Sequence, residues 1–219
     1  MKLMVIGGGG REHALAWRLS KSPRVQKVYV APGNGGTATE PDLENVALDA
    51  VNDPDGLVRF LKDNEVAFTV VGPEAPLAAG LVDRLESEGL KVFGPRKAAA
   101  QLEASKDFAK QFMARYNIPT AGYQTFTDPA AACDYAKEQA ERFPGLPIVI
   151  KADGLAAGKG VVVAASLEEA HQAIADMLTA NKLGSAGSRV VIEDFLQGQE
   201  ASFMVVCDGK SAFALATSQ

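Results

Sequence analysis

Residues 150–161 carry residue types that bind phosphate groups. Two lysines and three glycines lie in this short segment: Lys151, Lys159, Gly154, Gly158 and Gly160. Glycine turns can aim backbone N–H groups at phosphate oxygens, and a charge-assisted hydrogen bond from lysine contributes about 1.5–3 kcal/mol. A Walker A loop is disfavoured, because the glycine spacing is one residue short and Gly160 replaces its Ser or Thr. A run of β-branched residues follows this segment, whereas a Walker A loop is followed by a helix. The segment therefore predicts a glycine-rich hairpin whose tip folds over the phosphates of a nucleotide.

Residues 191–200 offer a second set of candidates. A predicted strand runs into a short apolar linker, whose backbone N–H and C=O groups suit the edge of an adenine ring. The Glu200 carboxylate could accept hydrogen bonds from both ribose hydroxyls. A solvated acidic strand end explains the same residues equally well, so both interpretations stay open.

Four glycines, Gly7–Gly10, precede a predicted helix near the start of the chain. Backbone N–H groups at such a helix start form an anion site. The dinucleotide fingerprint fails, because Glu12 or His13 stands where its third glycine is required. NAD is therefore disfavoured. Arg11 and Glu12 are predicted polar ligands, whereas His13 is expected to be structural.

Strands alternate with helices over the first 94 or so residues. A helix should begin at Asp53-Pro54, an N-cap followed by proline, and another should follow Gly72–Pro76 and extend to about Glu88. Alternation of this kind predicts a doubly wound parallel sheet, with ligands at the carboxyl ends of the strands. The expected strands are Leu3–Ile6, Val28–Ala31, Val66–Val71 and Lys91–Phe93.

The second half of the chain has a different pattern. Helices are expected over roughly Lys97–Tyr116, from Asp128-Pro129, and from the capping box at Ser166 to about Asn181. Asp208-Gly209 signals a hairpin turn. The expected strands are Ile148–Lys151, Val161–Ala164, Val190–Glu193, Ala201–Val206 and Ala212–Ala216. We expect the last three strands to share one sheet, whose further partners lie beyond Gln219 in a truncated domain.

Composition narrows the class of protein. The 219 residues are 47% hydrophobic and 22% charged, as in globular proteins, and the net charge of −5 argues against a nucleic-acid binder. Cys133 and Cys207 have no metal-like spacing and suit a reducing compartment. No signal peptide or membrane-length apolar run is visible, so a cytoplasmic protein without membrane contact is expected.

Several motifs in a fixed order resemble one known family. They are Gly9-Gly10-Arg11-Glu12-His13-Ala14, Ala31-Pro32-Gly33-Asn34, Val71-Gly72-Pro73-Glu74, Phe93-Gly94-Pro95, Lys151–Gly160, Glu200-Ala201-Ser202-Phe203 and Ala216-Thr217-Ser218-Gln219. The set resembles the phosphoribosylamine–glycine ligase family (glycinamide ribonucleotide synthetases), which belongs to the ATP-grasp superfamily. The likeness extends over the whole chain.

This resemblance implies an activity. ATP would phosphorylate glycine, and the amine of 5-phosphoribosylamine would displace phosphate from the glycyl phosphate. The products would be glycinamide ribonucleotide, ADP and phosphate, in de novo purine (IMP) biosynthesis. It implies ATP and Mg²⁺ (or Mn²⁺) as cofactors, metal ligands beyond Gln219 and none in this chain, and a monomeric full-length enzyme. The fragment alone is expected to be inactive.

The resemblance also implies domains and site residues. Residues 1–94 would form a Rossmann-like substrate domain and residues 95–219 the first part of an ATP-grasp domain, with a lid at about 120–190. The nucleotide site would comprise Lys106 and Lys151 on the phosphates, the hairpin residues Gly154, Gly158, Lys159 and Gly160, then Glu193, Phe195 and Leu196 on adenine, and Glu200 on ribose. The phosphoribosylamine site would comprise Gly9, Gly10, Arg11, Glu12, Asn34 and Glu74.

Two alternatives stay open. Another ATP-grasp carboxylate–amine ligase or carboxylase would share Lys106, Lys151 and the hairpin. The chain by itself could also bind a nucleotide without turnover.

Overall fold

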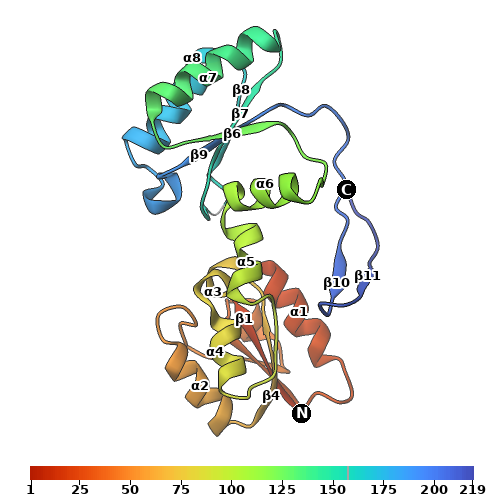
Figure 1. Cartoon of the computed structure of the whole chain (residues 1–219). Coiled ribbons are helices and arrows are strands. Elements are labelled where there is room, and N and C mark those ends of the chain that lie inside the picture. Colours follow the sequence, from red (N-terminus) through yellow and green to blue (C-terminus); the bar gives the residue numbers. More distant parts are fainter. Residues whose placement is uncertain (157) are drawn as a thin grey trace.

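A computed structural model describes residues 1–156 and 158–219. The first region, which contains β1 and β4, is the lower part of the molecule in Figure 1. It is built on a five-stranded parallel sheet in the order β3-β2-β1-β4-β5. Its strands are β1 (Lys2–Gly7), β2 (Lys27–Pro32), β3 (Leu43–Asn45), β4 (Val66–Val71) and β5 (Val92–Phe93). The predicted parallel sheet is confirmed. Strand β3 was not predicted, because it has three residues and only Leu43 is buried.

Helices cover both faces of this sheet. Alternate side chains of β1 point to opposite faces: Leu3 and Val5 pack with α1 (Gly10–Ser20), and Met4 and Ile6 face the other side. On that other side lie α2 (Pro54–Asp63) and α4 (Leu81–Ser87). Strands buried on both faces give the continuous apolar runs seen in the sequence. The predicted doubly wound architecture is confirmed.

Local signals set the helix ends. The Asp53 carboxylate accepts a hydrogen bond from the Gly56 N–H (2.8 Å), as the cap predicts. The single helix predicted after Gly72 is wrong, because the structure has α3 (Glu74–Ala79) and then α4. The break is at Gly80, whose φ of +97° lies in the left-handed region that ends helices.

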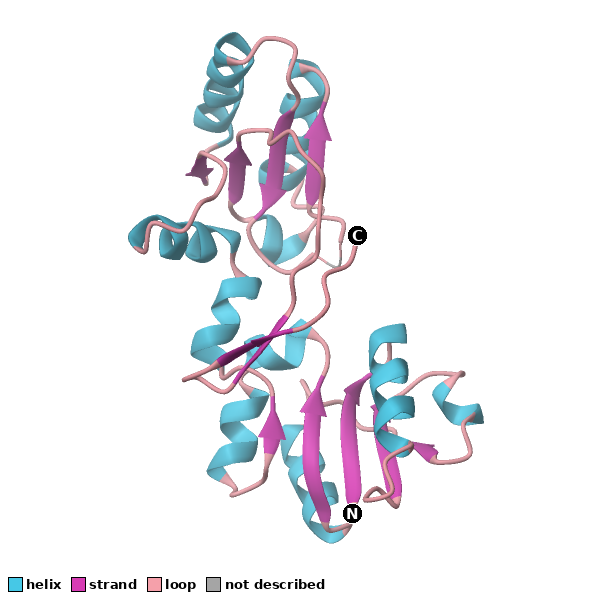
Figure 2. Ribbon diagram, turned by 90° about the vertical axis from the view of Figure 1, so that its right-hand side faces the viewer, coloured by secondary structure: helices cyan, strands magenta, loops and turns pink. Residues whose placement is uncertain are grey.

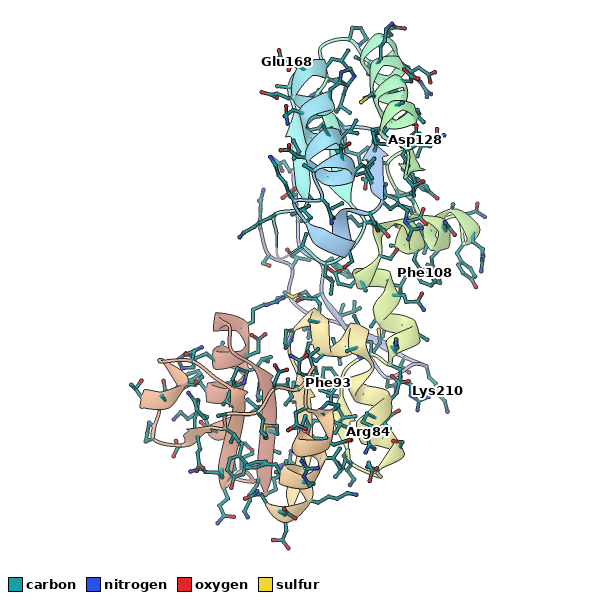
Figure 3. The ribbon with its side chains drawn as sticks, turned by 90° about the vertical axis from the view of Figure 1, so that its left-hand side faces the viewer. Arg84, Phe93, Phe108, Asp128, Glu168 and Lys210 are labelled. Atoms are coloured by element: carbon teal, nitrogen blue, oxygen red, sulfur yellow. The ribbon has the colours of Figure 1, made fainter. Side chains whose placement is uncertain are left out.

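A second, antiparallel sheet has the order β6-β9-β7-β8. Its strands are β6 (Tyr123–Phe126), which was not predicted, β7 (Ile148–Ala152), β8 (Val161–Ala164) and β9 (Val190–Glu193). Helices α7 (Pro129–Arg142) and α8 (Leu167–Ile174) pack on one face. Asp128 and Glu168 mark their N-terminal ends, at opposite ends of the antiparallel pair (Figure 3).

Shorter elements complete the chain. Helices α5 (Lys97–Ala104) and α6 (Lys106–Arg115) connect the two sheets (Figure 1). A π-helical turn, η2 (Ala175–Thr179), continues α8, and two 3₁₀ turns are η1 (Thr37–Thr39) and η3 (Gly184–Gly187). The predicted pair of helices over Lys97–Tyr116 is confirmed.

The last two strands are shorter than predicted and lie apart from the second sheet. Among the described residues, strands β10 (Val205–Cys207) and β11 (Ala212–Ala214) form a separate two-stranded antiparallel sheet (Figure 2). The expectation that they share a sheet with β9 is wrong, because β6 and β7 occupy both edges of β9. Lys210, in the connecting turn, lies level with the first region and far from Glu168 (Figure 3).

Among the helices of residues 1–156 and 158–219, none has the length and apolar character that crossing a bilayer requires.

Candidate nucleotide and substrate site

A cavity of about 610 Å³ lies between the first region and the β7–β8 hairpin. Two groups of residues that were predicted separately meet around it. From the first region come Arg11 and Glu74, and from the second come Lys106, Gly154, Gly158 and Gly160. The cavity therefore joins predicted substrate ligands to predicted nucleotide ligands.

Arg11 and Glu74 form an ion pair beside this cavity. The Arg11 Nη2 lies 3.0 Å from the Glu74 Oε1, and the Arg11 side chain is largely exposed. The hydrogen bond and charge of Glu74 raise the pKa of Arg11. The pKa of Glu74 is lowered, first by its own backbone N–H at the start of α3 and then by Arg11. Both groups are therefore charged, and the guanidinium keeps donors for an anionic ligand.

Glu12 is buried at the carboxyl ends of β1 and β4. Its Oε2 accepts a hydrogen bond from the Gly9 N–H (2.8 Å), whereas Oε1 has no hydrogen-bond partner among the described residues. Two glycines make room for the side chain, since a Cβ on Gly7 or Gly72 would lie 2.3 or 2.4 Å from the Glu12 Cγ. This oxygen is buried and lies 4.0 Å from the Arg11 Nε, so the structure places Glu12 beside Arg11 without exposing it to the cavity that Arg11 lines.

Asn34 uses its side chain within the loop after β2. Its Oδ1 accepts hydrogen bonds from the backbone N–H groups of Gly36 (2.7 Å) and Thr37 (3.0 Å). Its Nδ2 donates to the Gly8 carbonyl (3.0 Å), which ties this loop to the first glycine turn. Next to this turn is a mostly apolar cavity of about 540 Å³, lined by Gly8, Pro32 and Pro73 among others. Gly10 begins α1.

The β7–β8 hairpin forms as predicted, with Lys151 opposite Val161. The Gly154 N–H donates to the Ala186 carbonyl (3.2 Å), and a Cβ on Gly154 would lie 2.8 Å from the Ala186 Cα. Gly158 has a φ of +80°, so these two positions require glycine for different reasons. The Lys159 N–H donates to the Ala156 carbonyl. Within the predicted hairpin, Ala157 lies outside the described residues.

Three predicted nucleotide ligands, Lys106, Lys151 and Glu193, lie around a further cavity of about 300 Å³. Lys106 is the first residue of α6, and its Nζ is 3.4 Å from the Gly154 carbonyl. Lys151 and Glu193 lie on the sheet face opposite α7 and α8, and their Nζ and Oε1 are 3.0 Å apart. The other Glu193 oxygen pairs with Lys110, which the sequence interpretation missed.

Phe195 and Leu196 line another cavity, of about 220 Å³, together with Gln139, Phe143 and Ile148. Glu193 lines this cavity as well as the previous one, so the predicted adenine residues adjoin the predicted phosphate ligands. Glu200 lies in an exposed segment and lines none of the four cavities described above.

Comparison with known proteins identifies the family to which this chain belongs. A family model for the N domain of phosphoribosylglycinamide synthetase matches residues 1–103. A model for its ATP-grasp (A) domain matches residues 104–219. The chain belongs to the phosphoribosylglycinamide synthetase family.

Individual relatives agree with this family. The chain is 64% identical to phosphoribosylamine–glycine ligase from Neisseria meningitidis serogroup B, over all of this chain and 50% of that protein. It is equally similar, with the same coverage, to the Ralstonia nicotianae ligase. The chain spans about half the length of the curated relatives it matches.

Solved structures show the same fold. The Thermotoga maritima phosphoribosylamine–glycine ligase superposes with a TM-score of 0.76 at 32% identity, over 99% of this chain and 49% of that one. D-alanyl-alanine synthetase A from Vibrio cholerae gives a TM-score of 0.68 at 16% identity, over 99% of this chain and 66% of that one, which shows a shared fold alone.

In this member of the phosphoribosylglycinamide synthetase family, a charged network that the sequence interpretation missed supports the nucleotide side. The Asp153 carboxylate accepts hydrogen bonds from the Ser105 hydroxyl (2.9 Å), the Asp107 N–H (2.8 Å) and Arg189 (2.7 Å). The Lys106 N–H donates to the Asp153 carbonyl (3.1 Å). Asp153 thereby fixes the start of α6 against the hairpin, and with it Lys106.

A signal for this network exists in the sequence but is weak. Ser105 is a residue type that caps helices, and Asp153 directly follows a strand. Arg189 also pairs with Asp107 (3.2 Å), from a position 82 residues further along the chain. Partners so far apart in sequence show no spacing pattern.

Proposed function

We propose that the full-length gene product carrying this chain joins glycine to 5-phosphoribosylamine with ATP, releasing glycinamide ribonucleotide, ADP and phosphate. The names of the relatives support this reaction. The observation that carries it is the cavity between Arg11 and Glu74 on one side and Lys106 and the hairpin on the other. A ligase must hold an anionic sugar phosphate and a nucleotide next to each other, and this cavity adjoins predicted ligands for both.

The chemistry requires an activated carboxylate. An oxygen of glycine attacks the γ-phosphorus of ATP, ADP leaves, and glycyl phosphate results. The amine nitrogen of phosphoribosylamine then attacks the acyl carbon, phosphate leaves, and the amine loses a proton. Positioning and charge neutralisation dominate catalysis of the first step.

The residues of this chain divide these tasks. Lys106 and Lys151 would neutralise phosphate oxygens, and the N–H groups of the hairpin would hold them. Glu193, Phe195 and Leu196 would adjoin the adenine and Glu200 the ribose. Arg11 would pair with the sugar phosphate, and Glu12 would support Arg11 from the buried side.

Magnesium accompanies the nucleotide in a structural neighbour: the Hydrogenobacter thermophilus biotin carboxylase domain forms a complex with MgADP. Among residues 1–156 and 158–219, no group of three or more His, Cys, Asp or Glu side chains is arranged to hold a metal ion. We therefore derive no step through magnesium.

The organisation of the chain follows from the same proposal. Residues 1–94 would present phosphoribosylamine, residues 95–219 would bind the nucleotide, and residues of about 120–190 would act as a lid. We expect the full-length enzyme to be monomeric and to act in the cytoplasm, where its small, charged substrates are found.

Substrate-dependent ADP release from the full-length gene product tests the reaction. Release should require both glycine and freshly generated phosphoribosylamine. Arg11→Ala should raise KM for phosphoribosylamine and leave ATP affinity unchanged, whereas Lys106→Met should weaken ATP binding about 10- to 100-fold. Lys137→Met, an exposed lysine on α7, is the matched control.

Other outcomes would contradict the proposal. ADP release with a different carboxylate or with bicarbonate would indicate another ATP-grasp ligase or carboxylase. ATP binding without ADP release would leave only a nucleotide-binding function.

A further inference from the structure

Lys110 is a buried lysine that the reaction described above does not use. It lies one helical turn after Lys106 on α6, and its side chain is 7% exposed. Its ammonium group donates to the Thr120 hydroxyl (2.8 Å) and the Ala121 carbonyl (3.2 Å), and it pairs with the Glu193 Oε2 (3.0 Å). An ammonium group has three donors, so the three partners use all of them. Lys110 therefore has no donor left for a ligand.

Lys151 has the opposite arrangement around the same carboxylate. Its Nζ lies 3.0 Å from the Glu193 Oε1, and its side chain is 26% exposed. Glu193 is its only ion-pair partner among the described residues. Two of its three donors thus remain for a ligand, and they lie beside the cavity that Lys106 also lines.

Glu193 connects the two lysines. Its side chain is 8% exposed, and each oxygen contacts one ammonium group. A carboxylate held on one oxygen by a fully engaged lysine has little freedom to rotate, so its second oxygen has a fixed position. Lys151 and Glu193 are also diagonal neighbours on one sheet face, because Lys151 opposes Val191 in the register of β7 and β9. The ion pair with Glu193 and the position of Lys151 on the same sheet face therefore both constrain the orientation of the Lys151 side chain.

We propose that Lys110 is a positioning residue, which acts through Glu193 to hold the Lys151 ammonium group ready for a nucleotide phosphate. This inference rests on the proposed function, because it requires Lys151 to contact the nucleotide. The three charged groups then have different tasks: Lys110 fixes the Glu193 carboxylate, Glu193 fixes the Lys151 ammonium group, and Lys151 binds the phosphate. Lys106 stands outside this arrangement, since its Nζ contacts the Gly154 carbonyl at 3.4 Å.

A double-mutant cycle on the full-length gene product tests this assignment, with the dissociation constant of ATP as the measurement. Lys151→Met should weaken ATP binding about 10- to 100-fold. Lys110→Met should weaken it about fivefold to tenfold in the wild-type background. In the Lys151→Met background Lys110→Met should have no further effect, whereas in the Lys106→Met background it should keep its full effect. Lys137→Met again serves as the exposed control.

The cycle separates this role from its alternatives. A general loss of structure, or a through-space effect of the Lys110 charge, would persist in the Lys151→Met background and would overturn the inference. So would unchanged ATP affinity in Lys110→Met. If Lys110→Met does not fold, Lys110→Gln keeps a hydrogen-bonding end and replaces it in the same cycle. If the wild type binds ATP but the cycle is additive, only this inference fails; if the wild type binds no ATP, the proposed function fails with it.

Discussion

The two sheets position their candidate ligands by different means. In the first region, the ligands follow directly after parallel strands, and glycines create the space that they occupy, as Gly7 and Gly72 do around Glu12. In the second region, the ligands come from a helix and two antiparallel strands, and buried ion pairs hold them, as in Lys110, Glu193 and Lys151. Turns at a sheet edge depend on local sequence, whereas ion pairs depend on which segments the fold brings together.

This difference predicts different sensitivities. The first region should respond most to added volume, and the second should respond most to removed charge. A local device that both regions share, the aspartate N-cap, should have the same effect in each.

The largest effect is expected from Asp153→Ala. The carboxylate is buried and accepts from Ser105, Asp107 and Arg189, so its removal leaves donors unpaired. Because water can reach the partly exposed Arg189 side chain, the cost should be smaller than for a fully buried ion pair. We expect a loss of about 2–4 kcal/mol in the free energy of unfolding. Urea denaturation measures it. The exposed control Asp134→Ala should stay within about 0.5 kcal/mol of the wild type, and a similar small change in Asp153→Ala would contradict the role of the network.

Gly72→Ala tests the requirement for space in the first region. The new Cβ would lie 2.4 Å from the Glu12 Cγ, so the buried side chain would have to move. Overpacking of this kind costs about 1–3 kcal/mol. Gly10→Ala is the control, because nothing lies within 4 Å of its Cβ position. Glu12→Ala should recover part of the loss in a double variant, and no recovery would show that Glu12 does not cause it.

The two helix caps should behave alike. Asp53 accepts from the Gly56 N–H at the start of α2, and Asp128 accepts from the Ala131 N–H at the start of α7, each at 2.8 Å. Alanine at either position should cost about 1 kcal/mol, and asparagine should cost much less. Thermal unfolding of the four variants measures this. A cap that mattered in only one region would show that tertiary contacts, and not the cap, set the helix start.

The smallest effect concerns acid stability. Burial raises the pKa of Asp153, but hydrogen bonds from Asp107, Arg189 and Ser105 outweigh it, so the pKa lies below its usual value of 3.8. The unfolded chain then binds more protons than the folded one, and stability falls as the pH drops below about 4. Asp153→Asn should flatten this part of the stability curve. Denaturation at several pH values between about 2 and 6 measures the slope, and an unchanged slope would contradict the contribution of Asp153.

Many elements of the fold could be predicted from the sequence. Strands with continuous apolar runs, such as Val66–Val71 and Val190–Glu193, were predicted with their observed bounds. The caps at Asp53 and Asp128 marked helix starts correctly, because a cap involves only neighbouring residues. Short elements such as β3 and β6 were missed, since a few residues at a sheet edge have no distinct periodicity.

The predictions of the candidate site divide in the same way. The sequence by itself determined the glycine turns, the hairpin between β7 and β8, and the lysines beside them, because these depend on residue type and local spacing. Only the tertiary structure decided that Glu193 lies between Lys110 and Lys151, and that Asp153 joins Arg189 to the start of α6. The physical reason is that a buried charge is stabilised by partners within a few ångströms in space, and the partners here come from segments far apart in the chain.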